Sequence, residues 1–97
     1  MPKNSWNNSL QRYCEVKKIT ERYSEKVNNA ESNKSPSVRK VEKTISLLDD
    51  PYRTVIKNTF IDCKNLYWWI DYYSKTTYYR IRNRAINAFL MVYNTQQ

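Results

Sequence analysis

The clearest chemical pattern lies near the C-terminal end of the chain, where basic residues occur without acidic ones. From residue 72 onward the sequence contains Lys75, Arg80, Arg82 and Arg84 but no Asp or Glu. Lysine and arginine side chains bind phosphate groups, whereas a solubilising surface normally mixes both signs of charge. The pattern favours contact with a polyanion such as nucleic acid over the simpler alternative, a basic surface that only confers solubility.

A helical wheel of residues 74–93 shows which side chains share a face. Ile81, Ala85, Ala88 and Val92 lie on one face, which is expected to pack on the preceding helices. The other side carries groups that can bond bases and phosphates: Arg pairs with guanine, Asn with adenine, and Tyr or Thr with the backbone or a thymine methyl. The N-cap residue also leaves free backbone N–H groups for a phosphate. On these grounds the residues predicted to contact double-stranded DNA are Ser74, Lys75, Thr76, Tyr79, Arg80, Arg82 and Asn83.

The second half of this helix is apolar around most of its circumference. Ile86 and Leu90 lie on the outward side, opposite the predicted core face, and Tyr93 lies near them. A surface of this kind has to be covered by another apolar surface. The apolar stripe of an earlier helix, residues 5–28, is the expected cover, either within the chain or from a second subunit.

Composition favours an all-α fold. The chain has 97 residues and no Gly, and both tight β-hairpins and phosphate-binding loops depend on Gly. The length suits one small domain, and the net charge of +8 suits an anionic partner. Apolar residues spaced by three and four positions predict about five helices. Their expected ranges are residues 5–28, 36–48, 52–61, 66–72 and 74–93.

Local signals divide the chain. Residues 28–34 are polar and predict a linker, so we expect an N-terminal helix with its linker over residues 1–34 and a helix-turn-helix domain over residues 35–97. Ser35 followed by Pro36 marks a helix start. A short helix, a turn and a basic helix at the end follow the order of a helix-turn-helix DNA reader. Because such readers commonly bind paired half-sites, and because surplus apolar surface is expected, we predict a homodimer.

Other classes of function are not expected. The sequence has no His, and Cys14 and Cys63 lie far apart, so no metal site is predicted. With no Gly-rich loop either, no cofactor and no catalytic centre are expected, and acids such as Asp49 and Asp62 fall at helix ends, where capping explains them. No apolar run approaches the roughly 20 residues of a membrane span, and no signal-peptide core is present. We expect a cytoplasmic protein with reduced, partly buried cysteines.

The segment WWIDYYSKTTYYRIRNRAINAFL, residues 68–90, resembles the recognition helix of sigma-70 region 4 and the turn before it. The matching positions are Ser74, Thr77, Tyr78, Ile81, Arg84, Ala85, Ile86 and Phe89. Over residues 38–92 the chain is most similar to phage late-gene transcription regulators of the ArpU and RinA kind. The resemblance implies duplex DNA binding at a phage promoter in a bacterial host cell, and it adds Arg84 as a phosphate contact. One departure is the turn, where Tyr72 and Tyr73 stand in place of a small residue.

Two functions remain open at this stage. The first is a sequence-specific double-stranded DNA-binding transcription regulator. The alternative is a helical protein-interaction module or sigma-like factor whose main partner is RNA polymerase, with Trp68, Tyr72 and Tyr79 as binding hot spots. Binding that weakens steeply with salt indicates the first, and a complex that survives high salt without DNA indicates the second.

Overall fold

A computed structural model describes residues 5–28, 35–62 and 65–96, without the side chains of residues 5–9. This part of the chain contains four α-helices, one π-helical turn and no strand: α1 (Ser5–Asn28), α2 (Pro36–Leu47), α3 (Tyr52–Ile56), η2 (Lys57–Ile61) and α4 (Lys75–Thr95). The all-α class is confirmed. The expected linker, apart from Asn28, lies outside the described residues. The side chain of Trp6 and the whole of Cys63 also lie outside them.

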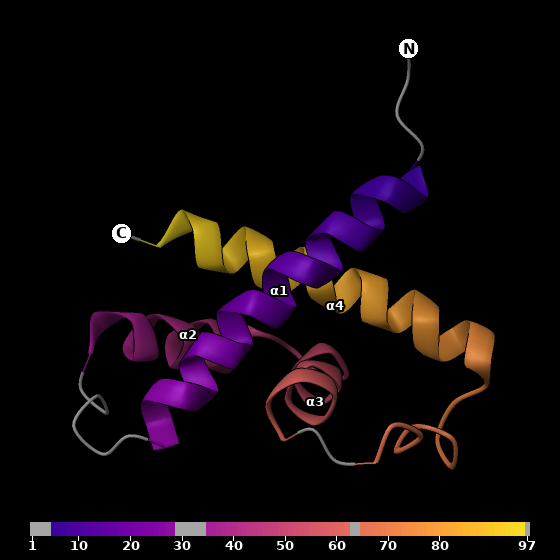
Figure 1. Cartoon of the computed structure of the whole chain (residues 1–97). Helices are drawn as coiled ribbons and strands as arrows, with labels where there is room; N and C mark the ends of the chain where they lie inside the picture. Colours follow the sequence, from indigo (N-terminus) through magenta and orange to yellow (C-terminus); the bar gives the residue numbers. More distant parts are fainter. Residues whose placement is uncertain (1–4, 29–34, 63–64, 97) are drawn as a thin grey trace.

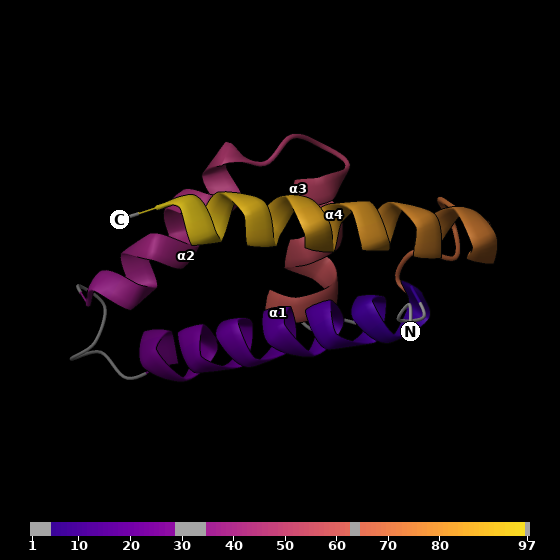
Figure 2. The same cartoon turned by 90° about the horizontal axis from the view of Figure 1, so that it is seen from above.

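The long helices α1 and α4 cross each other (Figure 1). Seen from above, they form two layers, and α3 spans the space between them (Figure 2). Accordingly, α3 contacts α4, η2 contacts α1, and α2 contacts both long helices. None of the helices described has the length and apolar character needed to cross a membrane.

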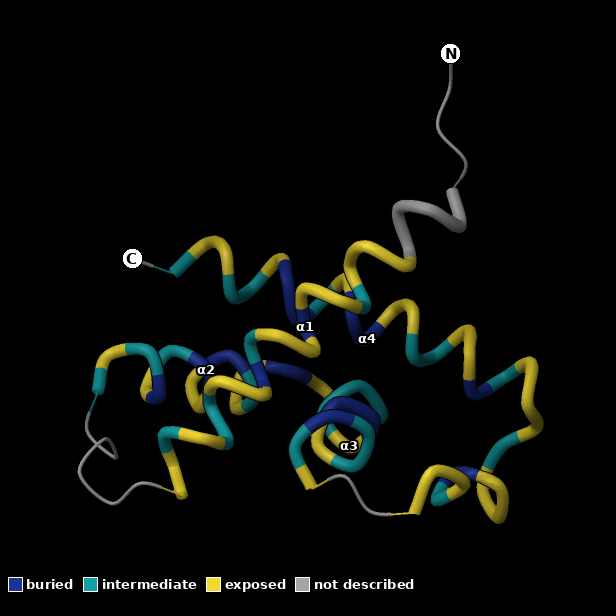
Figure 3. The backbone as a smooth tube through the Cα atoms, viewed as in Figure 1, coloured by how far each residue is buried: buried dark blue, intermediate teal, exposed yellow. Residues whose placement is uncertain are grey.

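All four helices contribute to a single buried cluster. Val16 of α1, Val55 and Ile56 of α3, and Ala85 and Phe89 of α4 have no exposed surface. Burying one such large aliphatic or aromatic side chain stabilises the fold by about 1.5–3 kcal/mol. Figure 3 marks these buried positions along the backbone. Helix α1 is therefore part of the same core as the C-terminal helices.

The expected helix starts are present. The hydroxyl of Ser35 accepts a hydrogen bond from the backbone N–H of Val38 (3.3 Å), and Pro36 occupies the first helical position. At the end of α2, the guanidinium of Arg53 donates to the carbonyls of Ile45 and Ser46, both at 3.2 Å. Cationic donors at a helix C-terminus satisfy carbonyls that lack an intrahelical partner. The boundaries of α2 are thus fixed by side-chain caps as well as by its apolar face.

The short helix predicted over residues 66–72 is not formed, and residues 65–73 make successive turns instead. In an α-helix the N–H of Ile70 would bond the carbonyl of Leu66. Here the indole N–H of Trp69 donates to that carbonyl (3.1 Å), and the N–H of Ile70 bonds Tyr67 (3.0 Å). The apolar spacing of this segment makes Leu66, Trp69, Ile70 and Tyr73 candidates for the core. Trp69 is buried and Tyr73 partly buried, whereas Leu66 and Ile70 are exposed. The count of about five helices is therefore not confirmed.

The expectation that the apolar side of the last helix carrying Ile86 and Leu90 is covered is confirmed. Both are buried, at 2% and 8% exposure. Helix α1 lies against this part of α4, since Arg12 donates to the side-chain oxygen of Asn87 (3.1 Å). The second half of α4 is therefore packed on two sides. The cover comes from within the chain, which answers the question left open by the pattern.

The ends of the α1 stripe do not take part in the core. Leu10 and Val27 are exposed, while Val16 at the centre is fully buried. Helix α1 crosses α4 at an angle (Figure 1), and its C-terminal end contacts α2 instead, where the Lys26 ammonium donates to the Ser37 hydroxyl (2.6 Å). Near the C-terminal end of α1, the hydroxyl of Tyr23 donates to the carboxylate of Glu42 on α2 (3.3 Å).

Candidate nucleic-acid interface

The start of α4 is built by Ser74. Its backbone is extended (φ −70°, ψ 162°), and its hydroxyl oxygen accepts a hydrogen bond from the N–H of Thr77 (3.2 Å). The Ser74 hydroxyl in turn donates to the hydroxyl of Thr77 (2.9 Å). A side-chain cap of this kind leaves the other first-turn N–H groups free to meet an anion. Ser74 is exposed at the expected place, but its hydroxyl proton serves the cap.

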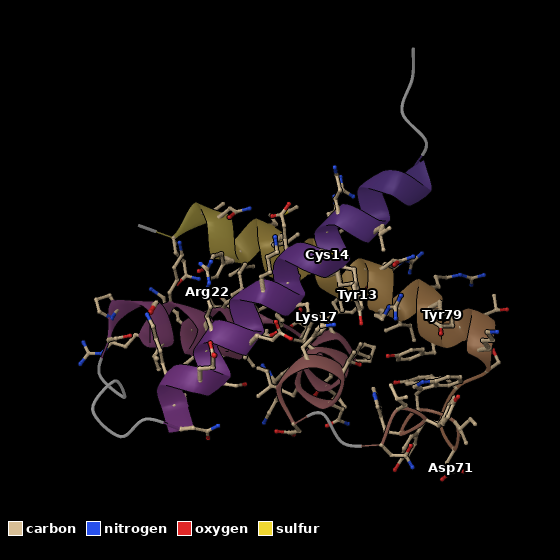
Figure 4. All side chains as sticks on the ribbon, viewed as in Figure 1. Tyr13, Cys14, Lys17, Arg22, Asp71 and Tyr79 are labelled. Carbon is tan, nitrogen blue, oxygen red and sulfur yellow. The ribbon has the colours of Figure 1, made fainter. Side chains whose placement is uncertain are left out.

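The first half of α4 presents most of the predicted contact residues to solvent. Tyr79 is 38% exposed. The other exposed members of the predicted set are Ser74, Lys75, Thr76, Arg80, Asn83 and Arg84. The acid nearest in sequence, Asp71, points away from α4 (Figure 4). We call this exposed set, together with Tyr79, the basic face; its charge is not offset by any acid of α4.

Arg82 differs from its neighbours. It is partly buried, and its guanidinium carbon lies 4.6 Å from the ring centre of Tyr79 and 4.8 Å from that of Tyr13 on α1. A cation over an aromatic ring is attracted by the negative face of the ring. The Arg82 Nε is buried and has no hydrogen-bond partner within the described chain. Arg82 thus joins α1 to α4 and supports Tyr79 instead of standing free on the surface.

Aromatic rings hold the turns of residues 65–73 against α4. The rings of Trp69 and Tyr78 stack at 4.6 Å with 6° between their planes. Trp68 meets Tyr78 edge-on at 5.9 Å, and its indole N–H donates to the Thr59 hydroxyl (3.3 Å). The hydroxyls of Thr59 and Tyr78 share a further hydrogen bond of 2.9 Å. This cluster, which the spacing of residues did not predict, orients the first turn of α4.

A cavity of about 510 Å³ opens between this cluster and α1. Its walls include Tyr67, Trp68, Trp69, Tyr79 and Arg82. The concentration of Trp and Tyr just before a basic helix is the sequence signal that could have indicated it, but the contribution of Tyr13 from α1 is visible only in the folded chain. We refer to it as the aromatic cavity.

Residues 65–73 carry several large apolar side chains that are mostly exposed. Leu66, Tyr67, Ile70 and Tyr72 are 83%, 60%, 59% and 73% exposed. Clusters of exposed apolar side chains mark binding surfaces more often than isolated ones do. This segment adjoins the basic face through Ser74.

Metal-binding groups do not gather among the described residues: no set of three or more His, Cys, Asp or Glu side chains is positioned to hold an ion there. Cys14 is a free, exposed thiol on α1 (Figure 4), not a partly buried one as expected. In the sequence, Cys14 lies between Tyr13 and Val16, two residues of the apolar stripe of α1 that face the core.

Comparisons with protein-family models, with curated proteins and with solved structures found no match. Two features at the start of α4 therefore indicate what the protein binds. These are the basic face, in which exposed Lys75, Arg80 and Arg84 surround Asn83, and the aromatic cavity beside it.

Proposed function

We propose that this protein is a sequence-specific double-stranded DNA-binding transcription regulator that reads DNA with the first half of α4. The observation that carries the proposal is the basic face: its three exposed cations, Lys75, Arg80 and Arg84, lie on a helix without acids. Phosphates attract such a face whatever the DNA sequence. Asn83 and Arg80 add donors that can distinguish adenine and guanine in the major groove.

In this proposal the turns of residues 65–73 and α4 together act as the helix-turn-helix unit. The stacked rings of Trp69 and Tyr78 hold the two segments together, in place of a regular first helix. The resemblance of residues 68–90 to sigma-70 region 4 and to the ArpU and RinA regulators supports action at a phage promoter. The proposal involves no catalysis and no cofactor.

The proposal is tested by the salt dependence of binding. Contacts from three exposed cations to phosphates correspond to a slope of about −2.7 in log affinity against log salt, or a loss of about 40-fold between 50 and 200 mM. Because the target sequence has to be found first, bound duplexes are selected from a random pool. Fluorescence anisotropy then measures affinity for the selected duplex and for an unrelated one.

Two variants separate reading of bases from attraction to phosphates. Arg80→Ala and Asn83→Ala are expected to weaken binding to the selected duplex by about 1–3 kcal/mol and to relax base preference. Arg22→Ala serves as the matched control. It removes another exposed arginine, which lies on α1 and away from the basic face (Figure 4). Equal affinities of all three variants and the parent protein for the selected duplex would refute the assignment.

A second candidate function is supported by the exposed apolar side chains of residues 65–73. Exposed Leu66, Ile70 and Tyr72 suit a protein partner, and RNA polymerase is the partner that the resemblance implies. A purified polymerase that stays bound at high salt, without DNA, and is released by Ile70→Asp would favour this function.

The formation of a homodimer is a separate prediction, independent of the choice between DNA and a protein as the main partner. Ile86 and Leu90, which were part of the apolar surface that motivated this prediction, are covered within the chain. Residues 65–73 now carry the large exposed apolar side chains nearest to the basic face. Sedimentation that shows only monomer at micromolar concentration, with and without DNA, would contradict a dimer on paired half-sites.

A further inference from the structure

We propose that the aromatic cavity accepts an unpaired nucleobase, so that the protein binds a locally opened DNA segment beside the duplex read by α4. This inference rests on the proposed DNA binding, and it extends it from paired to unpaired bases. The place is the junction of α1, η2, the turns of residues 65–73 and α4, all of which line the cavity.

The size and the walls of the cavity suit a flat ring. At about 510 Å³ it falls within the range of roughly 300–1,000 Å³ that is usual for small-molecule sites. Tyr67 and Tyr79 line it and are 60% and 38% exposed, so parts of both side chains remain open to a ligand. Bases stack on aromatic side chains whatever their identity, because each base has a π-face.

The cavity also offers polar groups. Arg82 lines it, and its buried Nε has no partner within the described chain. Besides this buried Nε, a guanidinium carries further N–H donors on its two terminal nitrogens, and these are the groups that Arg82 offers to a ligand in the cavity. The amide of Asn65 is a second lining group; its oxygen already accepts from the N–H of Tyr67 (2.9 Å). Ring nitrogens and carbonyl oxygens of a nucleobase are acceptors of the required kind.

Charge distinguishes this ligand from a protein side chain. The rim of the cavity adjoins α4, which carries exposed Lys75 and Arg80 and no acid. A strand whose base enters the cavity has its phosphates nearby, where a positively charged surface attracts them. A base within a duplex is covered on both faces by its neighbours, so only an unpaired base can stack on these rings.

The experiment compares three DNAs of one sequence: the duplex, the same duplex with a short mismatched bubble, and the single strand. Affinities are measured by fluorescence anisotropy at one salt concentration, and stacking is followed by quenching of Trp fluorescence. The parent protein is expected to bind the bubble more tightly than the duplex, with quenching only on DNAs that contain unpaired bases. Tyr67→Ala is expected to weaken binding to the bubble by about 5- to 100-fold and to leave duplex binding unchanged.

Two control variants define the site. Tyr67→Phe keeps the ring and is expected to keep the bubble preference. Tyr72→Ala removes another exposed tyrosine of the same segment, one that does not line the cavity, and it is expected to have no effect on the preference. Thermal unfolding of each variant shows that the fold is retained, since Tyr67 and Tyr72 are both surface residues.

The outcomes are distinguishable. Loss of the bubble preference in Tyr67→Ala alone supports the inference. If the duplex is bound but the bubble is bound no more tightly, or if Tyr67→Ala matches Tyr72→Ala, the inference is overturned while the proposed function stands; the exposed rings then belong to a protein contact. If no DNA is bound, the proposed function and the inference both fail.

Discussion

The contacts of Arg82 lead to a prediction that the sequence does not make, because this residue looks like its neighbours Arg80 and Arg84 in the chain. We predict that Arg82 and Tyr13 stabilise the fold jointly by bridging α1 and α4. The perturbation is the pair of substitutions Arg82→Met and Tyr13→Leu, singly and together. Methionine keeps the apolar stem of the arginine, and leucine keeps apolar bulk at position 13. Each change also removes contacts outside the pair, of Tyr13 with Phe60 and of Arg82 with Tyr79, and these cancel in a double-mutant cycle.

The expected coupling follows from the geometry. The distance of 4.8 Å from the Arg82 guanidinium carbon to the Tyr13 ring centre is within the range of a cation–π contact. For a partly buried arginine we expect about 1 kcal/mol, between the values for exposed and desolvated pairs. The effect of Arg82→Met alone is less informative, because it also removes the unpaired Nε, whose burial is unfavourable by a comparable amount of about 1 kcal/mol. The double-mutant cycle isolates the pair from this offset.

The assay is urea unfolding followed by circular dichroism, which yields the free energy of unfolding of the four proteins in the cycle. A second cycle with Arg80→Met and Tyr13→Leu is the control, since no contact joins exposed Arg80 to that ring. Its coupling energy is expected to be zero within about 0.3–0.5 kcal/mol. If the Arg82 cycle gives no larger coupling than the Arg80 cycle, the interhelical bridge is not a stabilising contact and the reasoning is refuted.

Three further predictions concern the cap, the core and one titrating group. Ser74→Ala should destabilise the protein by about 1 kcal/mol, because it removes the acceptor of the first turn of α4, and Ser74→Asp should restore most of it, as thermal unfolding will show. Ile86→Ala should lower the free energy of unfolding by about 2–5 kcal/mol, whereas Met91→Ala, at 69% exposure, should change it little; equal effects would contradict the packing of α4 on two sides. Burial, and secondarily the negative charge of Glu42, raise the pKa of Tyr23 above its usual value near 10. The folded state therefore holds this proton more tightly, so the contribution of Tyr23 is complete below pH 10 and is lost as the pH rises through the folded-state pKa; Tyr23→Phe should reduce that decline in urea unfolding at alkaline pH.

Features that depend on neighbouring residues could be predicted from the sequence. The absence of Gly and the three-and-four spacing of apolar residues indicated an all-α chain, and helices did form close to the expected ranges of α1, α2 and α4. Ser35 and Ser74 marked helix starts because an N-cap needs only a side-chain oxygen and the N–H groups of the next turn. Helical periodicity, which is also a local property, predicted the exposed positions of Arg80 and Asn83.

Only the tertiary structure decided where distant segments meet. The packing of the other helices on α4 buries Ile86 and Leu90. Helix α1 also brings Tyr13 to Arg82, which turns a predicted surface cation into an interhelical contact. The indole of Trp69 takes a carbonyl that a helix over residues 66–72 would have needed. Each of these results depends on contacts between groups that local pattern does not place together, because the crossing point of two helices is set by how all their side chains pack.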